Sequence, residues 1–98
     1  MGKYTVILAP DLDGMLLNHV RFIANVSIPA AKRFRTEYAE TIRRIADNPY
    51  QFPEYENPAL PKGVYRKALF AKWYKAVFYV EGNTVYLDAV VDGRSENG

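Results

Sequence analysis

Residues 64–91 read VYRKALFAKWYKAVFYVEGNTVYLDAVV, and this stretch decides the fold. Apolar and polar residues alternate along it, which is typical of β-strands that bury one face. Gly82-Asn83 is a strong hairpin signal, and Ala71-Lys72 marks a second tight turn. We therefore expect three antiparallel strands, at 64–70, 73–80 and 84–91.

The lengths of the two turns predict which side chains share a face of this sheet. With two residues in each turn, Phe70 lies opposite Trp73, and Glu81 lies opposite Thr84. One face then has Lys67 as its only charged residue, so we expect it to pack on the rest of the protein. The other members of this face are Tyr65, Leu69, Tyr74, Ala76, Phe78, Val80, Val85, Leu87, Ala89 and Val91.

The opposite face is expected to stay open, because no part of the chain remains to cover it. Basic groups among tyrosines suit phosphate contacts and base stacking. They also suit a groove that receives a helix or strand of a partner. The alternative is an amphipathic sheet that binds nothing. The expected members are Val64, Arg66, Ala68, Phe70, Trp73, Lys75, Val77, Tyr79, Tyr86, Asp88 and Val90, continued by Asp92 and Arg94.

The residues before the sheet predict a strand, a helical hairpin and a loop. The strand is expected within residues 1–9, where KYTVILA is apolar and rich in β-branched residues. Apolar residues then recur every three or four positions over 10–47, interrupted near Asn25, which predicts two antiparallel helices with Ser27 as the second N-cap. Residues 48–63 are rich in proline and predict a surface loop, ordered by inward packing of Tyr50, Phe52 and Tyr55. Residues 92–98 form a tail, so the 98 residues make one α+β domain.

Composition excludes several classes of function. The chain has no cysteine, so it forms no disulfide and has no cysteine nucleophile, and its one histidine is His19. We expect His19 on the surface of the first helix, and we expect no metal and no cofactor. No apolar run is long enough to span a membrane and no signal peptide is evident, so a cytoplasmic protein without membrane contact is the default expectation. The net charge is +2, with a local excess of positive charge in residues 19–44 and 62–75.

The order of these elements resembles the RelE/ParE superfamily of type II toxin–antitoxin toxins. The resemblance is carried by YTVILAPDLDGML at residues 4–16, SIPAAKRF at 27–34, the sheet segment 64–91 and DGR at 92–94. It implies a growth-inhibiting toxin that a cognate antitoxin neutralises by wrapping it with a helix and an extended segment. It also implies that DNA is contacted only indirectly, through the antitoxin.

RelE-like members of the superfamily are endoribonucleases that cut mRNA in the ribosome with basic groups and a tyrosine on the open sheet face. Under this resemblance the catalytic candidates are Arg66, Lys75, Arg94 and Tyr79. Ala68 stands where a further lysine is expected, and no C-terminal tyrosine is present. Under the predicted register Arg66 and Lys75 lie diagonally on one face, within reach of one anion, or Arg66 instead pairs with Asp88.

ParE-like members lack this catalytic set and poison DNA gyrase by binding it. The ending DGR and the depleted basic set resemble this branch more closely. The candidates for contact with the antitoxin or the target are Trp73, Phe70, Tyr86 and Asp88, with Trp73 as the largest anchor. A small RNA-binding or partner-binding module without toxicity is a third possibility on the same scaffold.

Overall fold

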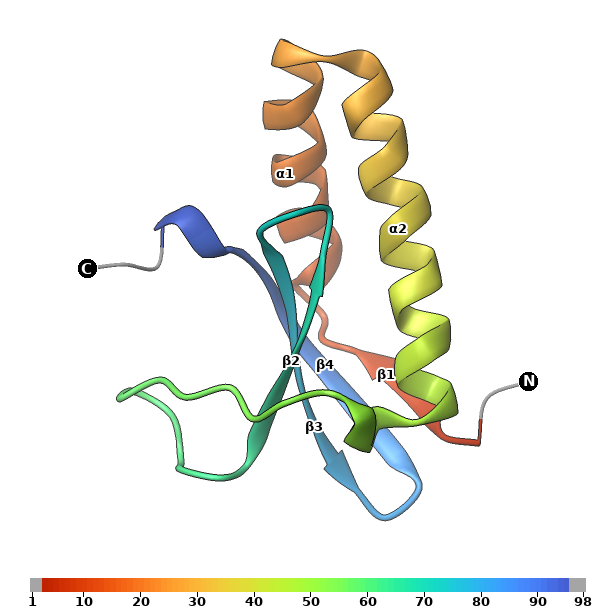
Figure 1. The fold of residues 1–98 in the computed structure, drawn as a ribbon, viewed down its shortest axis with the longest axis vertical. Coiled ribbons are helices and arrows are strands. Elements are labelled where there is room, and N and C mark those ends of the chain that lie inside the picture. Colours follow the sequence, from red (N-terminus) through yellow and green to blue (C-terminus); the bar gives the residue numbers. More distant parts are fainter. Residues whose placement is uncertain (1–2, 96–98) are drawn as a thin grey trace.

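Four strands form one mixed sheet with two helices on one face (Figure 1). The computed structural model describes residues 3–95, so Met1, Gly2 and the last three residues of the predicted tail lie outside the described residues. The strand order is β1-β4-β3-β2, with β1 parallel to β4 and the other pairs antiparallel. The predicted α+β architecture is confirmed. The elements are β1 (Thr5–Leu8), α1 (Leu12–Val26), α2 (Ile28–Asp47), η1 (Pro49–Gln51), β2 (Tyr65–Phe70), β3 (Tyr74–Glu81), β4 (Thr84–Asp92) and η2 (Gly93–Ser95).

The helical hairpin turns at Ser27, as its sequence predicts. The Ser27 hydroxyl accepts a hydrogen bond from the amide of Ala30 at 3.2 Å and so satisfies one of the unpaired donors at the start of α2. Pro29 fits the first turn because that position needs no amide donor. The first helix begins at Leu12, two residues later than Pro10. The amide of Leu12 donates to the carbonyl of Ala9, in a turn that joins β1 to the helix.

The turn between β2 and β3 is longer than the sequence predicts. Phe70 pairs with Tyr74, not with Trp73, so residues 71–73 form a three-residue connection. Ala71 and Lys72 have φ angles of 49° and 77°, a left-handed conformation in which alanine and lysine are uncommon. This extra residue reverses the two faces of β2. Ala68 and Phe70 are therefore buried against the helices, whereas Tyr65 and Leu69 lie on the open face.

A β-bulge in β4 changes the predicted faces a second time. Val77 pairs with Ala89, but the adjacent Phe78 pairs with Leu87, so Asp88 is the extra residue. Beyond the bulge, Val90 is buried among the core residues, and Ala89 and Val91 are on the open side. The Gly82-Asn83 turn has its predicted length, because Glu81 pairs with Thr84.

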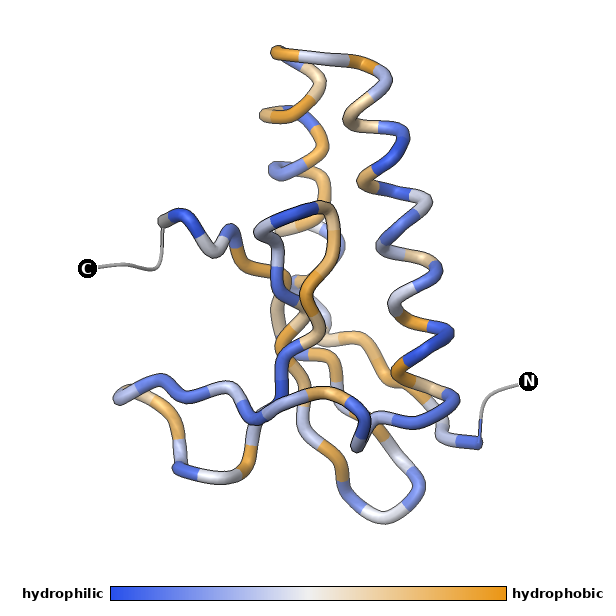
Figure 2. The backbone as a smooth tube through the Cα atoms, in the orientation of Figure 1, coloured by the Kyte–Doolittle hydropathy of each residue, from blue (hydrophilic) through white to orange (hydrophobic). Residues whose placement is uncertain are grey.

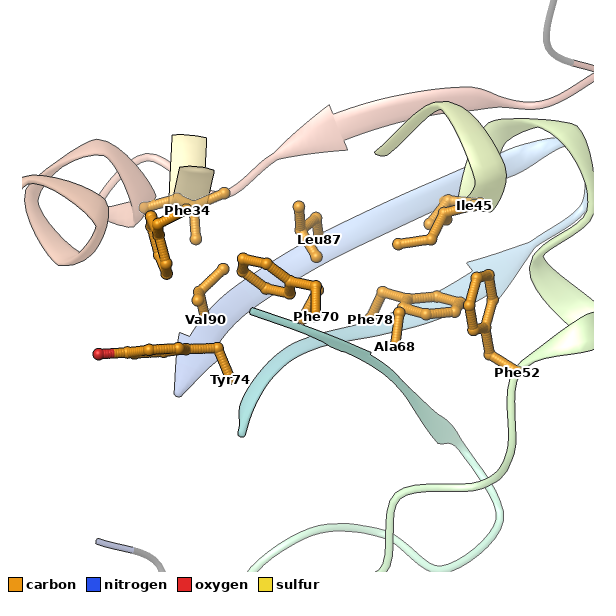
Figure 3. Packing of buried hydrophobic residues seen from close by; sticks show 12 residues of the cluster. Phe34, Ile45, Phe52, Ala68, Phe70, Tyr74, Phe78, Leu87 and Val90 are labelled. Carbon is orange, nitrogen blue, oxygen red and sulfur yellow. The ribbon is translucent and has the colours of Figure 1, made fainter. Parts of the chain in front are cut away.

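The hydrophobic core lies between the helices and the sheet. Phe34 and Ile45 of α2 lie over Leu87, Phe70 and Phe78 of the sheet (Figure 3). The Phe34 ring contacts the rings of Phe70 and Tyr74, with centroids 5.2 and 4.8 Å apart. Along both helices hydrophobic and hydrophilic residues alternate with the helical repeat (Figure 2). Each helix therefore packs its apolar face against the same face of the sheet. The helices leave the opposite face of the sheet uncovered.

The proline-rich loop runs along the outer edge of β2. The amide of Tyr55 donates a hydrogen bond to the carbonyl oxygen of Tyr65 at 2.8 Å. The amide of Lys67 donates one to the carbonyl oxygen of Pro53 at 3.0 Å. These bonds satisfy part of the strand edge, which would otherwise be open to pairing with another chain. Phe52 and Tyr55 are buried as predicted. Tyr50 is 54% exposed, so the prediction that it packs inward is wrong; its ring instead lies against the Tyr4 ring and the Arg66 guanidinium at the surface.

Neither helix is long and apolar enough to cross a membrane, as judged over residues 3–95. The same residues contain no group of three or more histidine, aspartate or glutamate side chains that would hold a metal ion.

Candidate functional site

The open face of the sheet carries a row of three tyrosines on three adjacent strands. Tyr86 of β4 pairs with Tyr79 of β3, which pairs with Tyr65 of β2. The Tyr79 and Tyr86 rings are stacked with centroids 5.0 Å apart and an angle of 20°, and the Tyr65 ring meets Tyr79 edge-on at 5.3 Å. We call Tyr65, Tyr79 and Tyr86 the tyrosine row. Ile7 of β1 pairs with Tyr86 and extends the row with an exposed aliphatic side chain.

Carboxylates adjoin the tyrosine row on both sides. The Tyr65 hydroxyl donates to Oδ2 of Asp88 at 2.9 Å, so the Tyr65 side chain spans from β2 across β3 to β4. This hydrogen bond is the main reason that the pKa of Tyr65 is raised. Glu81 follows Tyr79 two positions later on β3 and is exposed. Partial burial, followed by the charges of Asp88 and Glu81, raises the pKa of Tyr79.

The lysines of the open face lie beyond the tyrosine row. Lys67 pairs with Val77, one step from the row, and is half-buried. Lys75 lies one step further, where its ammonium is 5.7 Å from the centre of the Tyr55 ring. The row itself contains no cation.

Arg66 lies on the face opposite to Lys75 and Tyr79. It shares the orientation of Ala68 and Phe70, and its Nη1 donates to the carbonyl oxygen of Phe52 at 2.6 Å. Its guanidinium also lies 5.0 Å from the centre of the Tyr50 ring. The predicted diagonal pair of Arg66 and Lys75 around one anion is therefore wrong, and so is the alternative ion pair between Arg66 and Asp88. The cause is the three-residue β2–β3 turn, which reverses β2.

Phe70 is also not on the open face. It is 6% exposed and packs between Phe34 and Tyr38 of α2 and Tyr74 of β3. Its position is that of a core residue, not that of a surface contact for a partner. The same reversal of β2 explains the difference from the sequence prediction.

Trp73, Asp92 and Arg94 form a cluster at the end of the sheet. The Arg94 guanidinium lies 4.2 Å from the centre of the Trp73 ring and makes two side-chain hydrogen bonds to Asp92, at 3.1 and 2.8 Å. The hydrogen bond from Arg94 is the main cause of a lowered pKa at Asp92. Asp92 pairs with Tyr74, a core residue, so the prediction that it shares the open face is wrong. Trp73 lies in the turn and not at the start of the strand, where it was predicted, and it is partly exposed.

His19 faces the sheet and not the solvent. Its Nε2 donates to the carbonyl oxygen of Val90 at 2.8 Å, and its ring lies edge-on to Tyr74 at 5.1 Å. The expected surface position is wrong, because α1 turns this residue toward the strand β4. The interaction with a backbone carbonyl fixes α1 against the sheet.

A groove of about 610 Å³ lies between the two helices. Its floor is apolar, from Leu16, Leu17 and Val20 of α1, and it contains the Tyr38 ring. Arg35 and Asp13 supply one charge of each sign at its sides. Burial raises the pKa of Tyr38 to about 12, with a further contribution from Asp13. The amphipathic pattern of both helices was visible in the sequence, but the groove depends on the distance between them.

Comparison with known proteins supports the fold alone. No family model and no curated protein matches the sequence. Among solved structures, the chain is similar to one described as "Chromosomal ParDE TA system from P. aeruginosa", with a TM-score of 0.71 and 12% sequence identity. The similarity covers 92% of this chain and 96% of the other. The strand, the two helices and the three C-terminal strands in one mixed sheet thus share their fold with a chain of that structure.

Proposed function

We propose that this protein is the toxin of a type II toxin–antitoxin module, acting in the cytoplasm and neutralised by a cognate antitoxin. The observation that carries the proposal is the fold, which is similar over 92% of the chain to a chain of the ParDE system. The apolar groove between α1 and α2 offers a surface for an amphipathic helix of the antitoxin. Trp73, Tyr86 and Asp88 remain the proposed contacts with the antitoxin or the target.

Poisoning of DNA gyrase is the proposed mode of action. A RelE-like ribonuclease would need its cations and its tyrosine around one phosphate. Arg66 lies on the other face from Lys75 and Tyr79, and Arg94 is bonded to Asp92. This separation favours binding over phosphodiester cleavage. The ribosome-dependent ribonuclease, with Arg66, Lys75, Arg94 and Tyr79 as its catalytic residues, is the second candidate.

Induced expression in a bacterial host tests both candidates, with growth, the DNA-damage response and mRNA ends measured together. Growth arrest with a damage response and intact mRNA is the expected result. Arrest with cut, ribosome-bound mRNA would instead support the ribonuclease. Absence of arrest, with the protein folded and abundant, would contradict the toxin proposal.

Tyr79→Phe is the sharpest variant for separating the two modes. It removes only a hydroxyl from the open face, so a ribonuclease that uses this group would lose its mRNA cleavage. We expect the variant to stay toxic. Arg66→Ala is less informative, because it also removes the hydrogen bond to Phe52 that ties η1 to the sheet.

A further inference from the structure

The tyrosine row is an aromatic surface with negative charge beside it. Both helices lie on the other face of the sheet, and the three rings are half-buried, not covered. Asp88 adjoins the row at β4, and Glu81 adjoins it at β3. Oδ2 of Asp88 accepts a hydrogen bond from the Tyr65 hydroxyl. Its Oδ1 accepts none from the residues that the structure describes. A ligand can therefore bond to this second oxygen.

We propose that the tyrosine row binds an arginine-bearing segment of a partner protein, with a guanidinium against an outer ring face of the stacked Tyr79–Tyr86 pair and paired with Asp88 or Glu81. The faces of aromatic rings attract cations, and arginine is the cation that most often occupies such sites. A guanidinium also offers several donors in a plane, which suits contact with a ring and a carboxylate together. The proposal does not depend on whether the protein is a toxin.

The rings of the tyrosine row are already held in place without a partner. The stacked pair of rings is held by β3 and β4 at the centre of the sheet, and Tyr65 is fixed by its bond to Asp88. Rings that are already oriented lose little conformational freedom on binding. Ile7 continues the row to the edge strand, so an extended segment has an apolar contact next to the aromatic one.

The charges around the row favour a cationic segment over a nucleic acid. Tyrosines on an open sheet are also suited to stacking with bases. However, the carboxylates nearest to the row would repel the phosphates. Of the two lysines on this face, Lys67 is half-buried one step away, and Lys75 is directed to the Tyr55 ring. An arginine-bearing segment is attracted by the same carboxylates.

Fluorescence anisotropy with a labelled hexa-arginine peptide tests the proposal on the full chain. Hexa-glutamate and a ten-residue oligo-dT serve as alternative probes. We expect binding of hexa-arginine, weakened about fivefold by Tyr79→Leu or Tyr86→Leu and retained by the corresponding phenylalanine variants, since phenylalanine keeps the ring face. Tyr50→Leu is the matched control, because Tyr50 is an exposed tyrosine outside the row.

The carboxylates have a matched control as well. Asp88→Asn and Glu81→Gln are expected to weaken hexa-arginine binding severalfold, whereas Glu56→Gln, the same change of charge in the proline-rich loop, leaves it unchanged. Circular dichroism spectra identical to wild type show that each variant is folded. Equal affinity across all these variants would mean that the peptide binds elsewhere and would overturn the proposal. So would tight binding of oligo-dT that is lost in Tyr79→Leu, which would make the row a nucleic-acid surface.

Discussion

The amide nitrogen of Gly93 lies 2.8 Å from the carbonyl oxygen of Trp73, to which it donates a hydrogen bond. This bond joins the β2–β3 turn to the residue that follows β4. Such an approach of two backbones requires glycine, because a Cβ atom at position 93 would lie 2.5 Å from the Trp73 oxygen. The start of the C-terminal segment is thus held against the turn, beside the contact of Arg94 with the Trp73 ring.

Gly93→Ala is therefore expected to lower the free energy of unfolding by about 1–3 kcal/mol. The added methyl group forces the two backbones apart and breaks their hydrogen bond. Urea unfolding measures the loss, and the fluorescence of Trp73, the one tryptophan of the chain, reports the local change. Gly14→Ala is the control, since nothing lies within 4 Å of a Cβ there and alanine favours a helix over glycine by about 1 kcal/mol. A loss of stability at position 14 alone would contradict this reading.

The register of β2 can be tested by two neighbouring substitutions. Ala68 is fully buried opposite Ala76, so Ala68→Leu is expected to overpack the core at a cost of about 1–3 kcal/mol. Leu69 is 55% exposed on the open face, so Leu69→Thr is expected to change stability by less than about 0.5 kcal/mol. Urea midpoints of the two variants check both values. If the β2–β3 turn had two residues, the two effects would be reversed, and the loss of stability would be found for Leu69→Thr instead of Ala68→Leu.

Much of the fold follows from local patterns in the sequence. The Ser27 cap, the Gly82-Asn83 turn and the alternation along the strands act over a few residues, and each is confirmed. What the sequence did not reveal depends on single-residue shifts. The same alternating pattern permits both one residue more in the β2–β3 turn and one bulged residue at Asp88. The longer turn reverses the faces of β2, and the bulge reverses the faces of β4 after Asp88.

The candidate site is affected most by these two shifts. Tyr79 and Tyr86 share the open face as predicted, because the turn between their strands has its predicted length. Tyr65 was missed and Arg66 and Phe70 were misplaced, because all three are on the reversed strand β2. One signal favoured the observed register: it buries Ala68 and Phe70 and places Lys67 on the open face, so the helix side of β2 carries no lysine.

The buried hydroxyl of Tyr38 makes no hydrogen bond to any described residue. An unpaired hydroxyl in the interior costs free energy, so Tyr38→Phe is expected to raise the free energy of unfolding by about 1 kcal/mol at pH 7. Urea unfolding measures the difference. Tyr50→Phe, which alters an exposed tyrosine, is expected to have no effect. A destabilised Tyr38→Phe would mean that the hydroxyl has a partner.

The raised pKa of Tyr38 predicts that the protein loses stability at alkaline pH. The folded state raises the pKa of Tyr38 from 10.0 to about 12, so it favours the protonated phenol. The stabilisation that comes from this raised pKa is complete below pH 10. It declines between pH 10 and 12, where Tyr38 ionises in the unfolded chain before it ionises in the folded one. The advantage of Tyr38→Phe over wild type should therefore grow from pH 9 to pH 11. An advantage that is constant over this range would contradict the raised pKa.

Asp92 predicts a loss of stability in acid. Its pKa lies below the ordinary value of 3.8, chiefly because the Arg94 side chain donates to it. A carboxyl whose pKa is lowered by folding stabilises the folded state above the unfolded value, and this contribution is lost as the pH falls through the folded one. Asp92→Asn should therefore reduce stability at pH 6 and have little effect at pH 2.

A double-mutant cycle with Arg94→Gln identifies the partner. If the Asp92–Arg94 pair is the source, Asp92→Asn costs less in the Arg94→Gln background than in wild type at pH 6, and this coupling disappears at pH 2. The effect is small, because the Arg94 side chain is 48% exposed and water screens the pair. Raising the salt concentration should weaken the coupling further. Additive costs at pH 6 would show that the lowered pKa of Asp92 has another cause, and that Arg94 is held mainly by the Trp73 ring.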